Sequence, residues 1–138
     1  MTTTESIVDT RTTKYIQKTL TVLDIRRHAT NAEILSDLRV DYLNLTATTV
    51  HRITARLYAR GIIGCAPLAE DGSCRYDITP QTHHHFSCMQ CKSLCDIPNT
   101  TAFDALVDQM KELSDDCASV DTLTAQGLCK NCFKKGRI

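Results

Sequence analysis

Apolar residues in the first sixty positions recur three or four residues apart in three successive segments. These segments cover residues 13–27, 31–38 and 47–60, and polar residues occupy the positions between the apolar ones. This spacing predicts three amphipathic helices. A modest loop joins the last two, which is typical of a helix-turn-helix.

Local signals indicate where two of these helices begin and where the third ends. Thr30 and Glu33 have the spacing of a capping box at the start of the second helix. Thr46 can cap the third helix, and Gly61 follows its last turn. The helix boundaries are therefore predicted from capping chemistry as well as from periodicity.

Two short apolar segments follow, residues 62–66 and 74–78, with the polar residues 70–73 between them. This arrangement predicts a β-hairpin. A hairpin directly after a helix-turn-helix is a wing, and Pro80 then interrupts the pattern. We therefore expect a winged-helix DNA-binding domain over residues 1–79.

The remainder of the chain predicts a small α/β domain over residues 86–138, after a hinge over residues 80–85. The expected elements are strands at 86–88, 94–97 and 120–125 and an amphipathic helix at 101–113. Taken together, the predicted fold class is α+β.

The charge of the chain is unevenly distributed, although the 138 residues have a formal net charge of zero. Residues 42–69 contain three arginines and no acidic residue, whereas residues 96–121 contain seven acidic residues and one lysine. This asymmetry fits a protein in which one half meets a polyanion, although a solvated arginine face would look the same. No segment has the composition of a membrane span or a secretion signal, so a cytoplasmic protein is expected.

Two pairs of cysteines have C-x-x-C spacing, Cys88 with Cys91 and Cys129 with Cys132. Each pair presents two thiolates from a tight turn, and two such pairs supply the four sulfur ligands of a structural Zn²⁺ site. Free thiols and a thioredoxin-like redox motif are the alternatives. The other four cysteines are expected to be small buried apolar residues. They are Cys65, Cys74, Cys95 and Cys117.

The histidines suggest a second metal site. In an extended segment His83 and His85 point the same way and can share an ion, although a polar surface strand has the same pattern. His28, Asp77 and Asp96 are further candidate ligands, but their spacing alone does not bring them together.

The combination resembles the ferric uptake regulator family of metal-dependent transcriptional repressors, from about Thr13 to Cys132. The segments that carry the resemblance are His28–Ile34, Thr48–Arg52, Gly72–Asp77, His83–Cys91 and Gly127–Cys132.

The resemblance implies roles for individual residues. Cys88, Cys91, Cys129 and Cys132 match a structural zinc site. A regulatory metal site is implied for His28, Asp77, His83, His85 and Asp96. This set of nitrogen and oxygen ligands suits Fe²⁺ or Mn²⁺, with Zn²⁺ as the alternative. An aspartate at the last position resembles the peroxide-sensing branch, in which His28 and His83 would be oxidised.

The resemblance also implies a recognition helix, with DNA contacts from Thr49, His51, Arg52 and Arg56. The chain departs from the family at two of the positions that matter here. His51 stands where a tyrosine is usual, and Lys92 stands where a glycine commonly follows the first cysteine pair. A third metal site is expected to be absent, because no histidine follows His85.

The sequence thus predicts a metal-responsive repressor, not an enzyme, that binds a palindromic site in double-stranded DNA as a homodimer. A zinc uptake regulator, with Cys74 as a ligand, is the alternative within the family. Two alternatives lie outside it: a zinc-ribbon interaction protein that binds no DNA, and a thiol redox enzyme.

Overall fold

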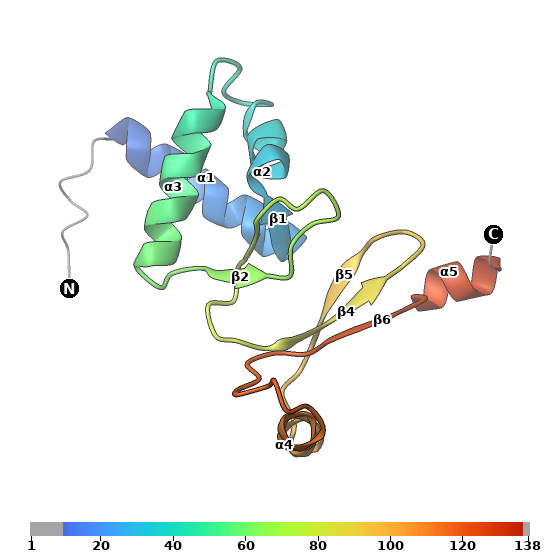
Figure 1. Cartoon of the computed structure of the whole chain (residues 1–138). Coiled ribbons are helices and arrows are strands. Elements are labelled where there is room, and N and C mark those ends of the chain that lie inside the picture. The colour runs from blue at the N-terminus through green and yellow to red at the C-terminus, as the bar shows by residue number, and fades with distance from the viewer. Residues whose placement is uncertain (1–9, 137–138) are drawn as a thin grey trace. The chain divides into compact units, whose positions relative to one another are not determined.

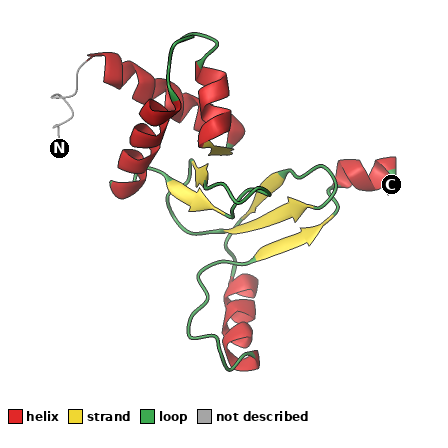
Figure 2. Cartoon of the chain, turned by 45° about the horizontal axis from the view of Figure 1, so that its top comes forward, coloured by secondary structure: helices red, strands yellow, loops and turns green. Residues whose placement is uncertain are grey.

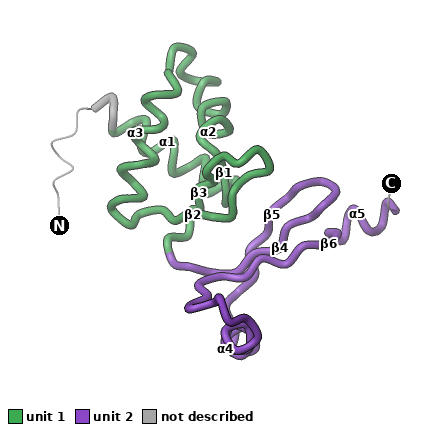
Figure 3. Tube along the Cα trace, viewed as in Figure 1, with its two compact units in different colours: residues 1–80 green, residues 81–138 purple. Residues whose placement is uncertain are grey.

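The computed structural model describes residues 10–136. The chain divides into two compact units, residues 1–80 and residues 81–138 (Figure 3). Both units combine helices with a three-stranded sheet, so the fold class is α+β as expected. Within the described residues, no helix is both long and apolar enough to cross a membrane.

Unit 1 begins with the three expected helices, α1 (Thr10–Arg26), α2 (Asn31–Leu38) and α3 (Ala47–Ala59) (Figure 1). Their apolar stripes meet in one core, whose buried members include Leu23, Ile34, Leu38, Val50, Ile53, Leu57 and Ile63. The helix-turn-helix is therefore held by aliphatic packing.

The capping signals are confirmed. The Thr30 side chain accepts a hydrogen bond from the backbone N–H of Glu33, and the Glu33 side chain accepts one from Thr30. Thr46 accepts from the N–H of Thr49 at the start of α3. Gly61, with φ of 71°, follows α3 in the left-handed conformation that favours glycine.

The sheet of unit 1 has the strand order β1-β3-β2, and both pairings are antiparallel. Strands β2 (Gly64–Ala66) and β3 (Arg75–Asp77) form the expected hairpin, although each is shorter than its apolar segment. Strand β1 (His28–Thr30) was not expected from the sequence, because three residues between two helices carry no periodic signal.

Unit 2 contains strands β4 (His84–Cys88), β5 (Leu94–Ile97) and β6 (Thr124–Gly127) in the order β5-β4-β6 (Figure 2). Strand β5 is antiparallel to β4, and β6 is parallel to it. The third strand lies a few residues later than the expected 120–125. Strand β4 begins inside the segment expected to be a hinge, and the boundary between the units falls after Pro80.

Two helices complete unit 2. Helix α4 (Thr101–Leu113) matches its expectation, whereas α5 (Lys130–Lys135) was not expected from the sequence. The ring of His84 stacks on that of Phe103 of α4, with centroids 4.4 Å apart. His84 Nδ1 also accepts a hydrogen bond from the backbone N–H of Leu123 at 3.0 Å. This buried histidine therefore ties β4 to α4 and to the segment before β6.

Candidate metal sites and the recognition helix

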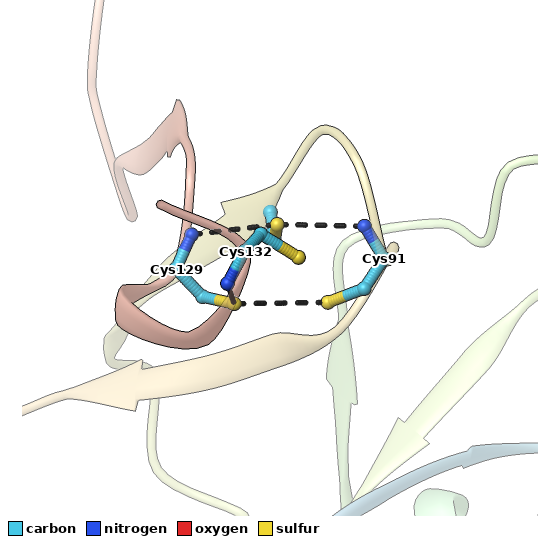
Figure 4. A group of neighbouring side chains, drawn as sticks. Cys91, Cys129 and Cys132 are labelled. Atoms are coloured by element: carbon cyan, nitrogen blue, oxygen red, sulfur yellow. Dashed lines mark hydrogen bonds between the residues drawn. The ribbon is translucent and has the colours of Figure 1, made fainter. Parts of the chain in front are cut away.

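The two cysteine pairs come together in unit 2. Cys88 ends β4 and Cys91 lies in the turn after it, while Cys129 caps α5 and Cys132 lies in its first turn. The sulfur atoms of these four cysteines all lie within 4.8 Å of one another. Figure 4 shows that the thiols of Cys91, Cys129 and Cys132 face one another.

The spacing of the sulfurs fits a zinc ion. In a tetrahedral site with Zn–S bonds of about 2.3 Å, sulfurs are about 3.8 Å apart. The Cys91 and Cys129 sulfurs are separated by 3.8 Å. The donor set, its closed shape and this distance therefore suit a structural zinc site, which links the two ends of unit 2.

Backbone N–H groups stabilise a thiolate in this cluster, the form that binds a metal cation. Those of Cys129 and Cys91 lie 3.4 and 3.5 Å from Cys88 Sγ, and they lower the pKa of that thiol to about 6. Burial instead raises the pKa of the Cys132 thiol to about 12. Without metal the cluster therefore keeps a proton, so metal binding to four thiolates must release protons.

The first half of the His/Asp set lies in unit 1. His28 of β1 and Asp77 of β3 are directly opposite each other in the antiparallel register. His28 Nε2 is 3.5 Å from Asp77 Oδ2, and the Asp77 side chain is fully buried. The other carboxylate oxygen, Oδ1, accepts a hydrogen bond from the Thr79 N–H at 2.8 Å. That bond holds the carboxylate with one oxygen toward His28.

The second half lies in unit 2 and is built in the same way. His85 of β4 is directly opposite Asp96 of β5. Asp96 Oδ1 is 2.9 Å from His83 Nε2 and 3.6 Å from His85 Nε2. Two imidazoles and one carboxylate therefore converge within this unit.

The orientation of His83 suits metal ligation. Its Nδ1 is 2.8 Å from the carbonyl oxygen of Gln81, which can only accept, so Nδ1 carries a proton. In the neutral ring Nε2 then has a lone pair directed at the Asp96 carboxylate. These two groups require a proton or a cation between them, and an N–H donated to a carbonyl is the usual support of a metal-binding histidine.

Helix α3 has one buried and one exposed face. Val50, Ile53 and Leu57 point into the core, whereas Arg52 and Arg56 are exposed and lie one turn apart. His51 is also exposed, and Thr49 is half-buried beside its cap Thr46. The residues expected to touch DNA thus lie on or at the edge of the solvent face of a helix fixed by its opposite side.

The expectation for the other four cysteines was wrong. Cys65, Cys74 and Cys95 are exposed, and Cys117 is half-buried. Cys65 and Cys74 lie in the short wing, where a three-residue strand gives little cover. Burial of these side chains depends on the depth of the surrounding sheet, which the sequence pattern does not reveal.

A family model for the Ferric uptake regulator family matches residues 8–116, well over half of the chain. The chain belongs to the ferric uptake regulator family, as the sequence motifs indicated. It is therefore a metal-binding and DNA-binding regulator of transcription and not an enzyme. This result excludes a zinc-ribbon interaction protein and a thiol redox enzyme.

Solved structures share the fold at low identity. The Helicobacter pylori ferric uptake regulator has 19% identity and a TM-score of 0.67, covering 90% of this chain and 83% of that chain. The Campylobacter jejuni peroxide stress regulator has 18% identity and a TM-score of 0.65, covering 88% of this chain and 91% of that chain. A zinc uptake regulator complexed with zinc and DNA has 16% identity and a TM-score of 0.61, covering 88% of this chain and 82% of that chain. A search of curated proteins finds no match.

Proposed function

We propose that this protein is a metal-responsive repressor whose DNA binding is controlled by one divalent cation. The residues proposed to hold the cation are His28, Asp77, His83, His85 and Asp96. The structural zinc ion is proposed to bind separately, at the four-cysteine cluster.

The observation that carries this proposal is the pair of preformed His/Asp sets. Each unit contributes a histidine that faces a carboxylate across a strand pair, and neither set alone fills a coordination shell. Three imidazoles and two carboxylates form an all-nitrogen and oxygen shell, which suits Fe²⁺ or Mn²⁺. A cation shared by both units would supply the positive charge that these paired groups require.

A shared cation would couple metal binding to DNA binding. Metal that binds only when both sets take part favours one arrangement of the two units, and DNA that needs the same arrangement tightens metal binding reciprocally. In a homodimer this arrangement sets the spacing of two copies of α3, which suits a palindromic operator. Leu106, Met110 and Leu113 leave apolar surface exposed on α4, as expected of a dimer-forming unit.

The decisive experiment replaces one ligand and keeps its neighbour as a control. The variant His83→Ala should keep its structural zinc and its dimer but lose metal-stimulated DNA binding. Thr82→Ala, one residue away and outside the proposed set, should respond like the wild type. The measurement is DNA affinity with Fe²⁺, Mn²⁺ or Zn²⁺ added separately under anaerobic conditions, together with zinc content. A His83→Ala protein that still responds to metal would refute the proposed regulatory site.

The same assay separates the subtypes. If iron is the regulatory metal and the protein senses peroxide, peroxide should release it from DNA and leave added oxygen on His28 or His83 in a peptide mass map. If the protein is a zinc uptake regulator, Zn²⁺ should activate at far lower free concentration than Fe²⁺ or Mn²⁺, and these histidines should stay unmodified.

A further inference from the structure

His51 does not project freely from α3, because Asn31, the first residue of α2, holds its ring. Asn31 Nδ2 lies 3.3 Å from His51 Nδ1. On its other side, Asn31 Oδ1 lies 2.8 Å from the hydroxyl oxygen of Thr54, one turn further along α3. Thr54 is fully buried, so one end of this small network is fixed by the core.

The chemistry of the network determines which ring nitrogen carries the proton. The Thr54 hydroxyl donates to Asn31 Oδ1, and 2.8 Å is typical of an O–H···O bond. The atom of Asn31 that faces His51 is the amide nitrogen, which can only donate, so His51 Nδ1 accepts this hydrogen bond. An imidazole nitrogen that accepts a hydrogen bond has no proton, so the neutral ring carries its proton on Nε2.

His51 is the fifth residue of α3 and its side chain is exposed. Residues near the N-terminus of a recognition helix contact base edges in the major groove. A ring with a proton on Nε2 presents a donor there. Guanine offers two adjacent acceptors in that groove, O6 and N7, and adenine and thymine offer one each, whereas cytosine offers only a donor.

We propose that Asn31 and Thr54 lock His51 as a hydrogen-bond donor, so that His51 selects guanine over cytosine at one position of the operator. His51 is then the residue that touches the base, and Asn31 and Thr54 are positioning residues. The inference rests on the proposed DNA contact by α3 and adds a cause for its specificity.

The lock can be tested without DNA. In zinc-loaded protein with a neutral His51 ring, the ¹⁵N shifts of that ring should show a proton on Nε2. In Asn31→Asp the new carboxylate can only accept, so the proton should move to Nδ1. Asn44→Asp adds the same charge in the exposed loop before α3 and should leave the ring unchanged. A wild-type ring protonated on Nδ1 would overturn the proposal.

The consequence for DNA is read as a ratio of affinities, so that uniform repulsion by the added carboxylate cancels. Operators selected by metal-loaded wild-type protein from a random library are compared with the same operators changed at single positions. Loss of one hydrogen bond should reduce the preference for guanine over cytosine at one position roughly three- to tenfold in Asn31→Asp and in His51→Ala, but not in Asn44→Asp.

Thr54→Val removes the hydroxyl but keeps the shape, and should weaken the same preference by freeing the Asn31 amide. If Asn31→Asp and Thr54→Val keep the wild-type preference, the inference fails although DNA binding by α3 stands. If wild-type protein selects no DNA, or if Arg52→Ala and Arg56→Ala bind it as tightly as wild type, then the proposed DNA contact by α3 is itself refuted. These outcomes are separable in one series of measurements.

Discussion

Lys92 shows how a single residue can conflict with the turn that it occupies. It follows Cys91 with φ of 66°, a left-handed conformation in which a Cβ is unfavourable. Its N–H donates to the carbonyl of Cys88 at 3.0 Å, so the turn that presents the cysteine pair imposes this conformation. Glycine is common at this position in the family, because glycine adopts the left-handed conformation without a steric penalty.

Lys92→Gly should therefore stabilise the zinc-loaded protein by about 1 kcal/mol, because glycine adopts this conformation without the steric penalty. Lys92→Ala retains Cβ and should bring no such gain. Denaturant unfolding at matched zinc content measures both. Equal stability of the two variants would show that the turn carries no strain.

Arg52 and Arg56 are each proposed to contact DNA individually, through their own guanidinium groups. Arg52→Ala or Arg56→Ala should weaken DNA binding by about 1–3 kcal/mol while the fold and the dimer persist. A loss confined to one base position would indicate direct readout, and a uniform loss would indicate a phosphate contact. Affinity measured over a panel of operator variants distinguishes the two. Unchanged affinity in both variants would place the DNA contacts elsewhere.

Among the elements, short strands determine which candidate metal ligands face each other. Strand β1 has three residues, yet its pairing with β3 places His28 opposite Asp77. The pairing of β4 with β5 places His85 opposite Asp96 in the same manner. A shift of either register by one residue would turn these side chains to opposite faces, so the candidate ligands depend on strand pairing.

The capping box at Thr30 lies at the end of β1, so it supports both this strand and α2. Thr30→Ala should destabilise unit 1 by about 1 kcal/mol because the N–H of Glu33 loses its partner. Thr30→Ser keeps the hydroxyl and should lose much less. Thermal or denaturant unfolding of the zinc-loaded protein gives the comparison, and equal losses would assign the effect to the missing methyl group instead.

For the whole molecule, the two units differ in how they are stabilised. The buried hydrophobic side chains of the described residues lie almost entirely in unit 1, and those in unit 2 are Cys88 and Cys132. Helix α4 has no buried residue in the described chain. Unit 2 thus has little core of its own, and metal binding at its cysteines would contribute directly to its folding.

Cys88→Ser or Cys129→Ser should therefore lose zinc and either unfold unit 2 or abolish the dimer. Elemental analysis, circular dichroism and sedimentation test this together. Protons compete with zinc for the thiolates, and backbone N–H groups lower the pKa of Cys88 to about 6. Zinc affinity should accordingly weaken as the pH falls, and because bound zinc itself stabilises the thiolates, its release should begin only below that pH. A folded dimer of either variant would contradict a structural role for the site.

The sequence by itself determined the features that depend on neighbouring residues. Helices α1 to α4 follow from apolar periodicity, the starts of α2 and α3 and the end of α3 follow from capping signals, and the cysteine pairs follow from C-x-x-C spacing. Each of these signals acts over a few residues, so the local sequence is sufficient to predict it.

Only the tertiary structure decided which distant residues meet. Strand β1, the facing of His28 with Asp77, the contact of Asn31 with His51 and the exposure of Cys65 depend on segments separated by many residues. No local propensity specifies such pairings, because strand register and side-chain burial are fixed by packing of the whole unit. The metal-ligand types could be read from the sequence, whereas their partners and orientation could not.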